Sequence, residues 1–212
     1  MGSAKTTAKG VLAAVCLLAG SAAAGAAPAG VTYFLRAGST AQEGCHGLCA
    51  CLLLFPEPLR GTFVLTPGLP DPVFQNYTID DVRLRAPALG QVFVGSGTYQ
   101  TVSAPPGQQQ IFLNMSINGE PPLDWFGGRR TFAMPTPVVE ASASLPGNCF
   151  DIALIIKATP FRADWNADGA ISTDDVFDFL TGWLAGDGDA NEDGRIAVDD
   201  IFEFVNAWLA RR

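Results

Sequence analysis

The chain has 212 residues, 48% of them hydrophobic, and a formal net charge of -8 at pH 7. This length and composition predict one or two compact soluble domains. The charge is uneven, since residues 163–212 hold 12 acidic and 3 basic residues. Because no basic patch is available to neutralise phosphates, nucleic acid is not expected as a partner.

Residues 1–26 have the order of a secretory signal peptide. Lys5 and Lys9 precede an apolar run over residues 11–18, and small residues follow up to Ala26. The run is shorter than the roughly 20 apolar residues that a membrane anchor needs. We therefore expect cleavage after Ala26 or Ala27, no membrane span in the mature chain, and export to the periplasm, cell surface or medium.

Four cysteines remain after the predicted cleavage: Cys45, Cys49, Cys51 and Cys149. An even number in an oxidising compartment predicts two disulfides, for which three connectivities are possible. The competing interpretation is a zinc site made from Cys45, His46, Cys49 and Cys51.

Residues 27–160 are interpreted as an antiparallel β domain, either a sandwich or a small closed barrel. Short runs rich in Val, Phe, Tyr, Ile and Thr alternate with Gly and Pro, and no helical period is sustained. The predicted strands are 31–36, 51–55, 61–66, 73–85, 91–95, 98–103, 110–118, 138–142 and 150–158. In the seventh, apolar residues at 111, 113, 115 and 117 predict one face against a core.

Two turns are predicted between these strands. Asn118-Gly119 is a typical turn pair, and Gly95-Ser96-Gly97 is interpreted as a second turn.

No catalytic constellation is recognisable in this β segment. His46 is the only histidine, and no G-x-S-x-G motif is present. Trp125 and Phe126 precede Arg129 and Arg130 in a Pro/Gly-rich loop, where aromatics and arginines can stack on sugars or anchor a partner. Because large aromatics are usually buried, we expect Trp125 and Phe126 to cap the core instead.

The last quarter of the chain contains an internal repeat with an offset of 25 residues. Asp164-Trp-Asn-Ala-Asp-Gly169 returns as Asp189-Ala-Asn-Glu-Asp-Gly194, and an apolar helix is predicted after each copy. D-x-N-x-D-G with an acid at position 12 is the pattern of a calcium loop, in which oxygens at alternate positions converge on one ion. Asp/Asn turns that cap helices without metal are the alternative.

The loop pattern predicts two Ca²⁺ ions and a ligand set for each. The first loop supplies side-chain oxygens of Asp164, Asn166 and Asp168, the carbonyl of Ala170, Ser172 directly or through water, and Asp175. The second supplies Asp189, Asn191, Asp193, the carbonyl of Arg195, and Asp200, with a water in place of a side chain at Ala197.

Residues 161–212 resemble a type I dockerin, the paired calcium-loop-and-helix module of secreted bacterial proteins. Each loop lacks the entering helix of an ordinary EF-hand and has Asp rather than Glu at position 12. Apolar residues from the two helices are expected to pack the halves together: Phe179, Leu180, Trp183 and Leu184 with Phe204, Val205, Trp208 and Leu209. The resemblance also extends to dockerin-like tails of exported proteins that carry cysteine-containing β domains.

The resemblance implies a cohesin-like protein partner or surface scaffold. Loop positions 10 and 11, here Thr173-Asp174 and Val198-Asp199, are then the expected partner-binding residues. The function predicted is an exported calcium-binding protein whose dockerin-like tail docks a β domain onto a partner. The alternative is a small carbohydrate-active enzyme or carbohydrate-binding module, anchored in the same way for polysaccharide degradation.

Overall fold

The structure is a computed structural model that describes residues 29–45, 52, 54–69, 71–102, 107–131, 138–147 and 151–211. The predicted signal peptide lies outside these residues, as do His46, Cys49, Cys51 and Cys149. Cys45 is described and directly follows the second strand. The predicted disulfides, and the alternative zinc site, therefore stay predictions.

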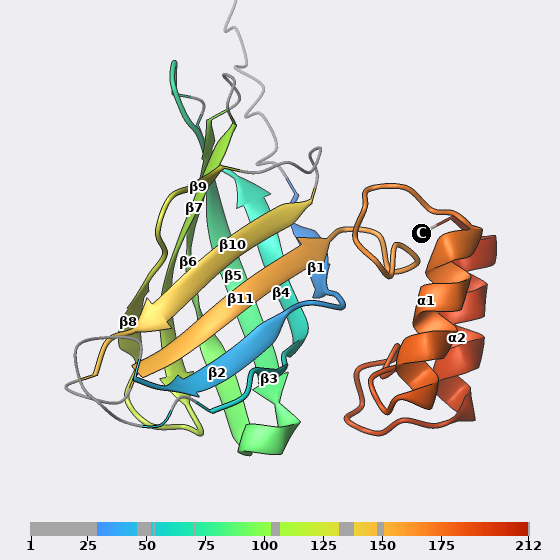
Figure 1. Cartoon of the computed structure of the whole chain (residues 1–212). Coiled ribbons are helices and arrows are strands. Elements are labelled where there is room, and N and C mark those ends of the chain that lie inside the picture. Colours follow the sequence, from blue (N-terminus) through green and yellow to red (C-terminus); the bar gives the residue numbers. More distant parts are fainter. Residues whose placement is uncertain are drawn as a thin grey trace, which may run out of the picture.

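The first part of the chain forms one antiparallel sheet that closes on itself where its first and last strands in sequence pair (Figure 1). The strands are β1 Val31–Leu35, β2 Thr40–Gly44, β3 Glu57–Pro58, β4 Arg60–Pro67, β5 Gln75–Ala86, β6 Gln91–Val102, β7 Gln108–Ile117, β8 Leu123–Phe126, β9 Arg130–Thr131, β10 Val139–Leu145 and β11 Asp151–Thr159. The order runs β1-β4-β5-β6-β7-β8-β10-β11-β2-β3, with β9 beside β7. β1 also pairs with β11, Phe34 opposite Thr159. Of the two predicted alternatives, this pairing favours the closed barrel over the sandwich.

Alternation of apolar and polar residues places the core inside this closed sheet. In β7 the side chains of Ile111, Leu113 and Met115 are buried while Asn114 between them is exposed, as the sequence pattern predicts. Trp125 and Phe93 meet edge-to-face in the same core, with ring centroids 5.6 Å apart. The interior is therefore filled by side chains rather than hollow.

The predicted turn at Gly95-Ser96-Gly97 is wrong, because β6 runs straight through it. These glycines allow close packing against β7: a Cβ on Gly95 would lie 2.1 Å from the carbonyl oxygen of Asn114, and one on Gly97 2.1 Å from that of Phe112. A strand glycine can mark either a turn or a close backbone approach. By contrast, the turn at Asn118-Gly119 is confirmed, with positive φ at both residues.

Three further differences concern short or exposed segments. Described residues in the predicted strand 51–55 are not in a strand, while the short strands β2, β3, β8 and β9 were missed. β3 and β9 have two residues each, too few for a period-2 pattern to appear. Trp125 lies in the core as expected, but Phe126 is 55% exposed, because neighbouring residues of β8 point to opposite faces of the sheet.

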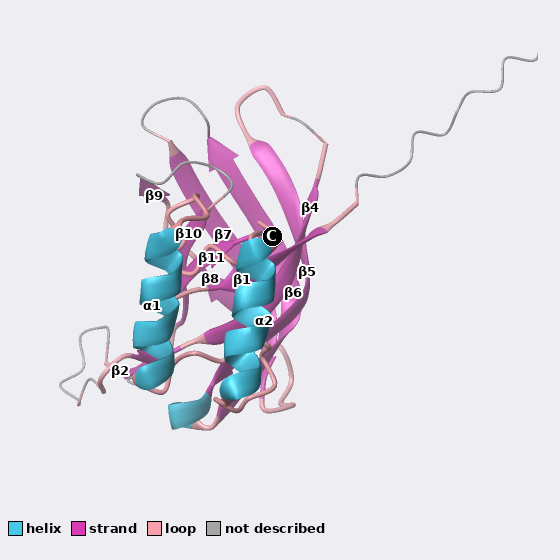
Figure 2. Cartoon of the chain, turned by 90° about the vertical axis from the view of Figure 1, so that its right-hand side faces the viewer, coloured by secondary structure: helices cyan, strands magenta, loops and turns pink. Residues whose placement is uncertain are grey.

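Two helices follow the sheet, α1 Thr173–Leu184 and α2 Val198–Leu209, and they lie side by side (Figure 2). Near the end of α1, Trp183 donates its indole N–H to the carbonyl of Ala197, the residue before α2; Trp208 of α2 donates likewise to Ser172, the residue before α1. This exchange makes the helices antiparallel and approximately two-fold related. In the described part of the chain, neither helix is long and apolar enough to cross a bilayer.

The small core between the helices contains only some of the expected residues. Phe179 and Phe204 stack with ring centroids 4.2 Å apart, and Trp165 meets Phe179 edge-to-face at 5.0 Å. Leu180, Leu184, Val205 and Leu209 were expected in this core but are exposed. Each helix has apolar residues on two faces, and only the face of Phe179 or Phe204 turns inward.

Replacing Gly95 with Ala is expected to lower the free energy of unfolding by about 1–3 kcal/mol, because the added methyl group overlaps the β7 backbone. Gly128→Ala is the matched control, since a Cβ there has no neighbour within 4 Å. The control should be neutral or slightly stabilising. Urea unfolding measures both, and equal midpoints for the two variants would contradict the close-approach interpretation.

Candidate calcium loops and their contact with the sheet

Each loop is organised by the Asp at position 12, which also lies in the first turn of the following helix. Asp175 accepts backbone N–H bonds from Trp165, Asn166 and Ser172 at 2.8, 3.3 and 2.8 Å. Asp200 accepts them from Ala190, Asn191 and Ala197 at 2.9, 3.2 and 2.8 Å. These donors occupy the same loop positions in both copies, so the sequence repeat is also a repeat of hydrogen bonds.

The first half of each loop turns around the carboxylate at position 1. Gly169 donates its N–H to Asp164 Oδ2 at 3.2 Å, and Gly194 donates to Asp189 Oδ2 at 2.9 Å. Both glycines have positive φ, 88° and 89°, which residues with a Cβ rarely adopt. The side chain of Asn166 or Asn191 accepts from the Asp two residues later, at 3.0 or 2.9 Å.

Burial makes these carboxylates costly to hold without a counter-charge. Asp164, Asp175 and Asp200 are fully buried. Burial, more than any other cause, raises the pKa of Asp164, Asp175 and Asp189 above the ordinary value, and neighbouring loop carboxylates raise it further. A buried carboxylate is normally paired or bound to a metal, so these loops have the electrostatics of a cation site.

One oxygen is conspicuously without a partner. Asp189 Oδ1 is buried and accepts no hydrogen bond, while Oδ2 of the same carboxylate is bonded to Gly194. Position 1 of a calcium loop supplies one carboxylate oxygen to the ion, and oxygen donors of this type suit Ca²⁺. In these respects the residues fit the ion. Across the described residues, however, no three His, Cys, Asp or Glu side chains are gathered closely enough to hold a metal.

The other predicted ligands lie on the same two loops. The Ser172 hydroxyl accepts from Asp174 N–H at 3.1 Å and caps α1, whereas Ala197 before α2 has no side-chain cap. Asp168 and Asp193 each accept a backbone N–H two residues later, from Ala170 and Arg195, both at 2.8 Å. The expected partner-binding residues, Thr173, Asp174, Val198 and Asp199, are all exposed at the first turns of the helices.

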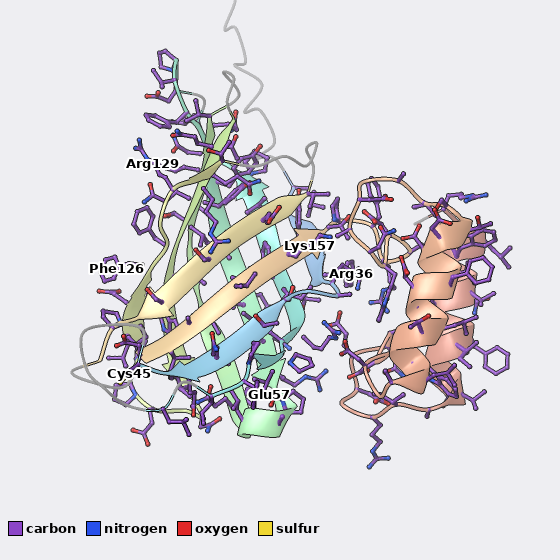
Figure 3. All side chains as sticks on the ribbon, viewed as in Figure 1. Arg36, Cys45, Glu57, Phe126, Arg129 and Lys157 are labelled. Carbon is purple, nitrogen blue, oxygen red and sulfur yellow. The ribbon has the colours of Figure 1, made fainter. Side chains whose placement is uncertain are left out.

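A buried arginine joins the loops to the sheet, as Figure 3 shows. Arg36, just after β1, is 4% exposed. Its guanidinium donates to the carbonyl oxygens of Asp164, Phe161 and Arg162 at 3.0, 3.2 and 3.0 Å, and it lies 5.5 Å from the ring centroid of Trp165. Burial lowers the pKa of Arg36 to about 9, opposed by the charges of Glu192 and Asp164, so Arg36 stays a cation at neutral pH.

Further cations of the sheet contact the loops or the link between the helices. Arg60 pairs with Asp187, and Arg85 pairs with Asp189 at 3.3 Å. Lys157 donates to the carbonyl of Asn166 at 2.5 Å. A cavity of about 400 Å³ lies at this contact and is lined by residues of both parts, among them Arg60, Arg85 and Asp187.

These basic contacts were not predicted from the sequence. Arg83 and Arg85 alternate with Val82 and Leu84 along β5, yet the Arg83 side chain is 70% exposed and that of Arg85 29%. The alternating pattern places both arginines on one face of β5. Residues about one hundred positions later in the chain cover that face at Arg85 but not at Arg83. No local signal distinguishes the two arginines.

No protein-family model, curated protein or solved structure matches this chain. The functional interpretation therefore depends on the residues and their geometry.

Replacing Arg36 with Met should destabilise the protein by about 3 kcal/mol or more, because one buried and two partly buried carbonyl oxygens lose their donor. Arg83→Met, at an exposed arginine, should change the free energy of unfolding by no more than about 0.5 kcal/mol. Urea unfolding followed by tryptophan fluorescence makes the comparison. Similar effects of the two substitutions would show that Arg36 does not hold the parts together.

Proposed function

We propose that this is an exported calcium-binding protein whose C-terminal module, residues 161–212, docks the β domain onto a protein partner or surface structure. The observation that carries the proposal is the repeated loop. Two D-x-N-x-D-G loops share one hydrogen-bond pattern around a buried Asp at position 12, and Asp189 Oδ1 at position 1 of the second loop is buried without a partner.

Calcium binding is supported by the electrostatics of a small module. A module of about fifty residues can form only a marginal core, and here the fully buried aromatic part of that core is Phe179 and Phe204, with Trp165 at 2% exposure. Buried carboxylates oppose folding unless a cation compensates them. Bound Ca²⁺ would then contribute folding free energy directly.

Docking is supported by the apolar surface of the helices. Phe177 and Phe202 are 67% and 63% exposed, and Leu184 and Leu209 are 80% and 67% exposed. These residues come in pairs related by the sequence repeat, on helices that lie beyond the loops as seen from the sheet (Figure 1). Large exposed apolar side chains that recur on both helices support a protein-binding surface.

The partner class rests on the resemblance to dockerins and on this surface. A cohesin-like domain that presents an apolar face would cover the exposed phenylalanines and leucines, with Thr173-Asp174 or Val198-Asp199 at the edge of the contact. Because the loops face the sheet, a partner on the helices would not have to displace the β domain.

A carbohydrate-binding role of the β domain is the second candidate, favoured by one surface feature. A groove of about 500 Å³ crosses the outer face of β10, β11 and β2, lined by Phe126, Arg130, Ser142 and Ser144 among others. Phe126 lies on the side of the sheet away from the helices (Figure 3). An exposed aromatic ring beside hydroxyl and guanidinium groups can stack on and hydrogen-bond a sugar.

Calcium should raise the melting temperature of the full chain, and a chelator should reverse the change, because the ion binds only the folded loops. The double variant Asp164→Ala/Asp189→Ala should lose this response, while Asp124→Ala in β8 should keep it. Differential scanning calorimetry with and without Ca²⁺ measures the effect. A wild-type melting temperature that does not change when Ca²⁺ is added would contradict the calcium proposal.

For docking, the full chain serves as bait in the native secretome. Proteins retained by the wild type in the presence of Ca²⁺ should be lost from the bait Phe177→Asp/Phe202→Asp, because the apolar contact is interrupted. Phe126→Asp is the matched exposed-aromatic control and should retain them. If Phe126→Asp abolishes binding to insoluble polysaccharide, the carbohydrate-binding candidate gains. If the bait Phe177→Asp/Phe202→Asp still retains the proteins that the wild type retains, docking through the helices loses its support.

A further inference from the structure

The β domain contacts the same atom in both calcium loops, but with different chemistry. Asp164 Oδ2, at position 1 of the first loop, accepts the hydroxyl of Thr159 from β11 at 3.0 Å. Asp189 Oδ2, at position 1 of the second loop, accepts from the guanidinium of Arg85 in β5 at 3.3 Å. Each oxygen also accepts the glycine N–H of its own loop, so the two sites differ in the group that the sheet supplies.

The Thr159 contact is made by an uncharged hydroxyl group that is fully buried. Thr159 is 0% exposed, and its hydroxyl also accepts the N–H of Phe161 at 3.2 Å, which aligns the hydroxyl proton with Asp164. A group that orients a metal ligand in this way adds affinity without adding charge.

The Arg85 contact brings a positive charge to the second loop. Arg85 holds Asp189 Oδ2 and also donates to the carbonyl of Glu192 within the loop. Its guanidinium is thus a resident cation beside the carboxylate that Ca²⁺ would use, and the two cations repel each other. The charge of Arg85 also lowers the pKa of Asp189 against the effect of burial.

Other cations at the interface do not contact a ligand carboxylate. Arg36 and Lys157 donate to the backbone carbonyls of Asp164 and Asn166 in the first loop. Arg162 donates to the carbonyl of Ala190 and to Glu203, outside the predicted ligand set. The charge of Arg36 also acts on Asp164 through space, but only Arg85 donates directly to a ligand carboxylate. This direct contact distinguishes the second loop from the first.

We propose that the β domain sets the two calcium affinities apart: Thr159 is a positioning residue that strengthens the first loop, and Arg85 is a resident cation that weakens the second. The inference rests on the proposed calcium binding. The chain then fills its loops in order, the first at low calcium and the second at higher calcium, where the ion competes with the contact between Arg85 and the loop.

Isothermal titration of the full chain with CaCl₂ tests this inference. The wild type should bind in two separable steps, of which Asp189→Ala retains the tighter and Asp164→Ala the weaker. Thr159→Val should weaken the tighter step by roughly tenfold or more, and Thr159→Ser, which keeps the hydroxyl, should restore it. Arg85→Met should tighten the weaker step by about tenfold, the order expected when one neighbouring charge is removed.

Two substitutions on β5 are matched controls. Arg83→Met removes an exposed arginine that pairs with Asp81, and Thr78→Val removes a hydroxyl that contacts Asp80; neither should change either step. If Thr159→Val does not fold, the Arg85→Met variant alone tests the inference, because Arg85 is partly exposed and its replacement is better tolerated. Two equal wild-type affinities, or no change in Arg85→Met, would overturn the inference while calcium binding stands. Absence of any binding to the wild type would overturn the proposed function itself.

Discussion

The buried guanidinium of Arg36 is the interaction on which the arrangement of the whole molecule depends. Arg36 directly follows the first strand, yet its hydrogen bonds go to three carbonyl oxygens of the segment that leads into the first D-x-N-x-D-G loop. Burying a cation is tolerable only when donors and acceptors are matched. Here the acceptors belong to an acidic module that in turn needs positive charge nearby. Arg60, Arg85 and Lys157 extend the same match along the interface.

The acidic module has two different surfaces, one formed by the loops and one by the helices. The loops face the sheet, where cations offset carboxylates whose pKa values are raised by burial. The helices keep apolar side chains outside, in pairs that follow the repeat. The approximate two-fold relation is maintained by the reciprocal tryptophan hydrogen bonds. It is broken where the loops meet the sheet, because a sheet without that symmetry cannot offer both loops the same side chain.

Local patterns predicted some features well and others poorly, for identifiable reasons. The period-2 alternation of β7 and the helix that follows each loop depend on neighbours within a few residues, so they could be predicted from the sequence. Gly95 and Gly97 suggested a turn, but glycines also occur where another backbone comes close. The sequence does not show which of the two applies; in the structure the β7 backbone lies against them. Trp165 in the module core had no signal either, since its counterpart in the second loop is Ala190.

The sequence by itself determined the β-rich first part, the repeated loops with their donor residues, and the helix that follows each loop, because these are encoded in local periodicity and spacing. Only the tertiary structure decided that the sheet closes through β1 and β11, that Phe126 and Leu184 face outward, and that Thr159 and Arg85 touch equivalent oxygens of the two loops. Contacts between residues more than one hundred positions apart, such as Arg85 with Asp189, depend on how whole elements pack. The same side chain can meet solvent or a carboxylate, and packing alone selects between them.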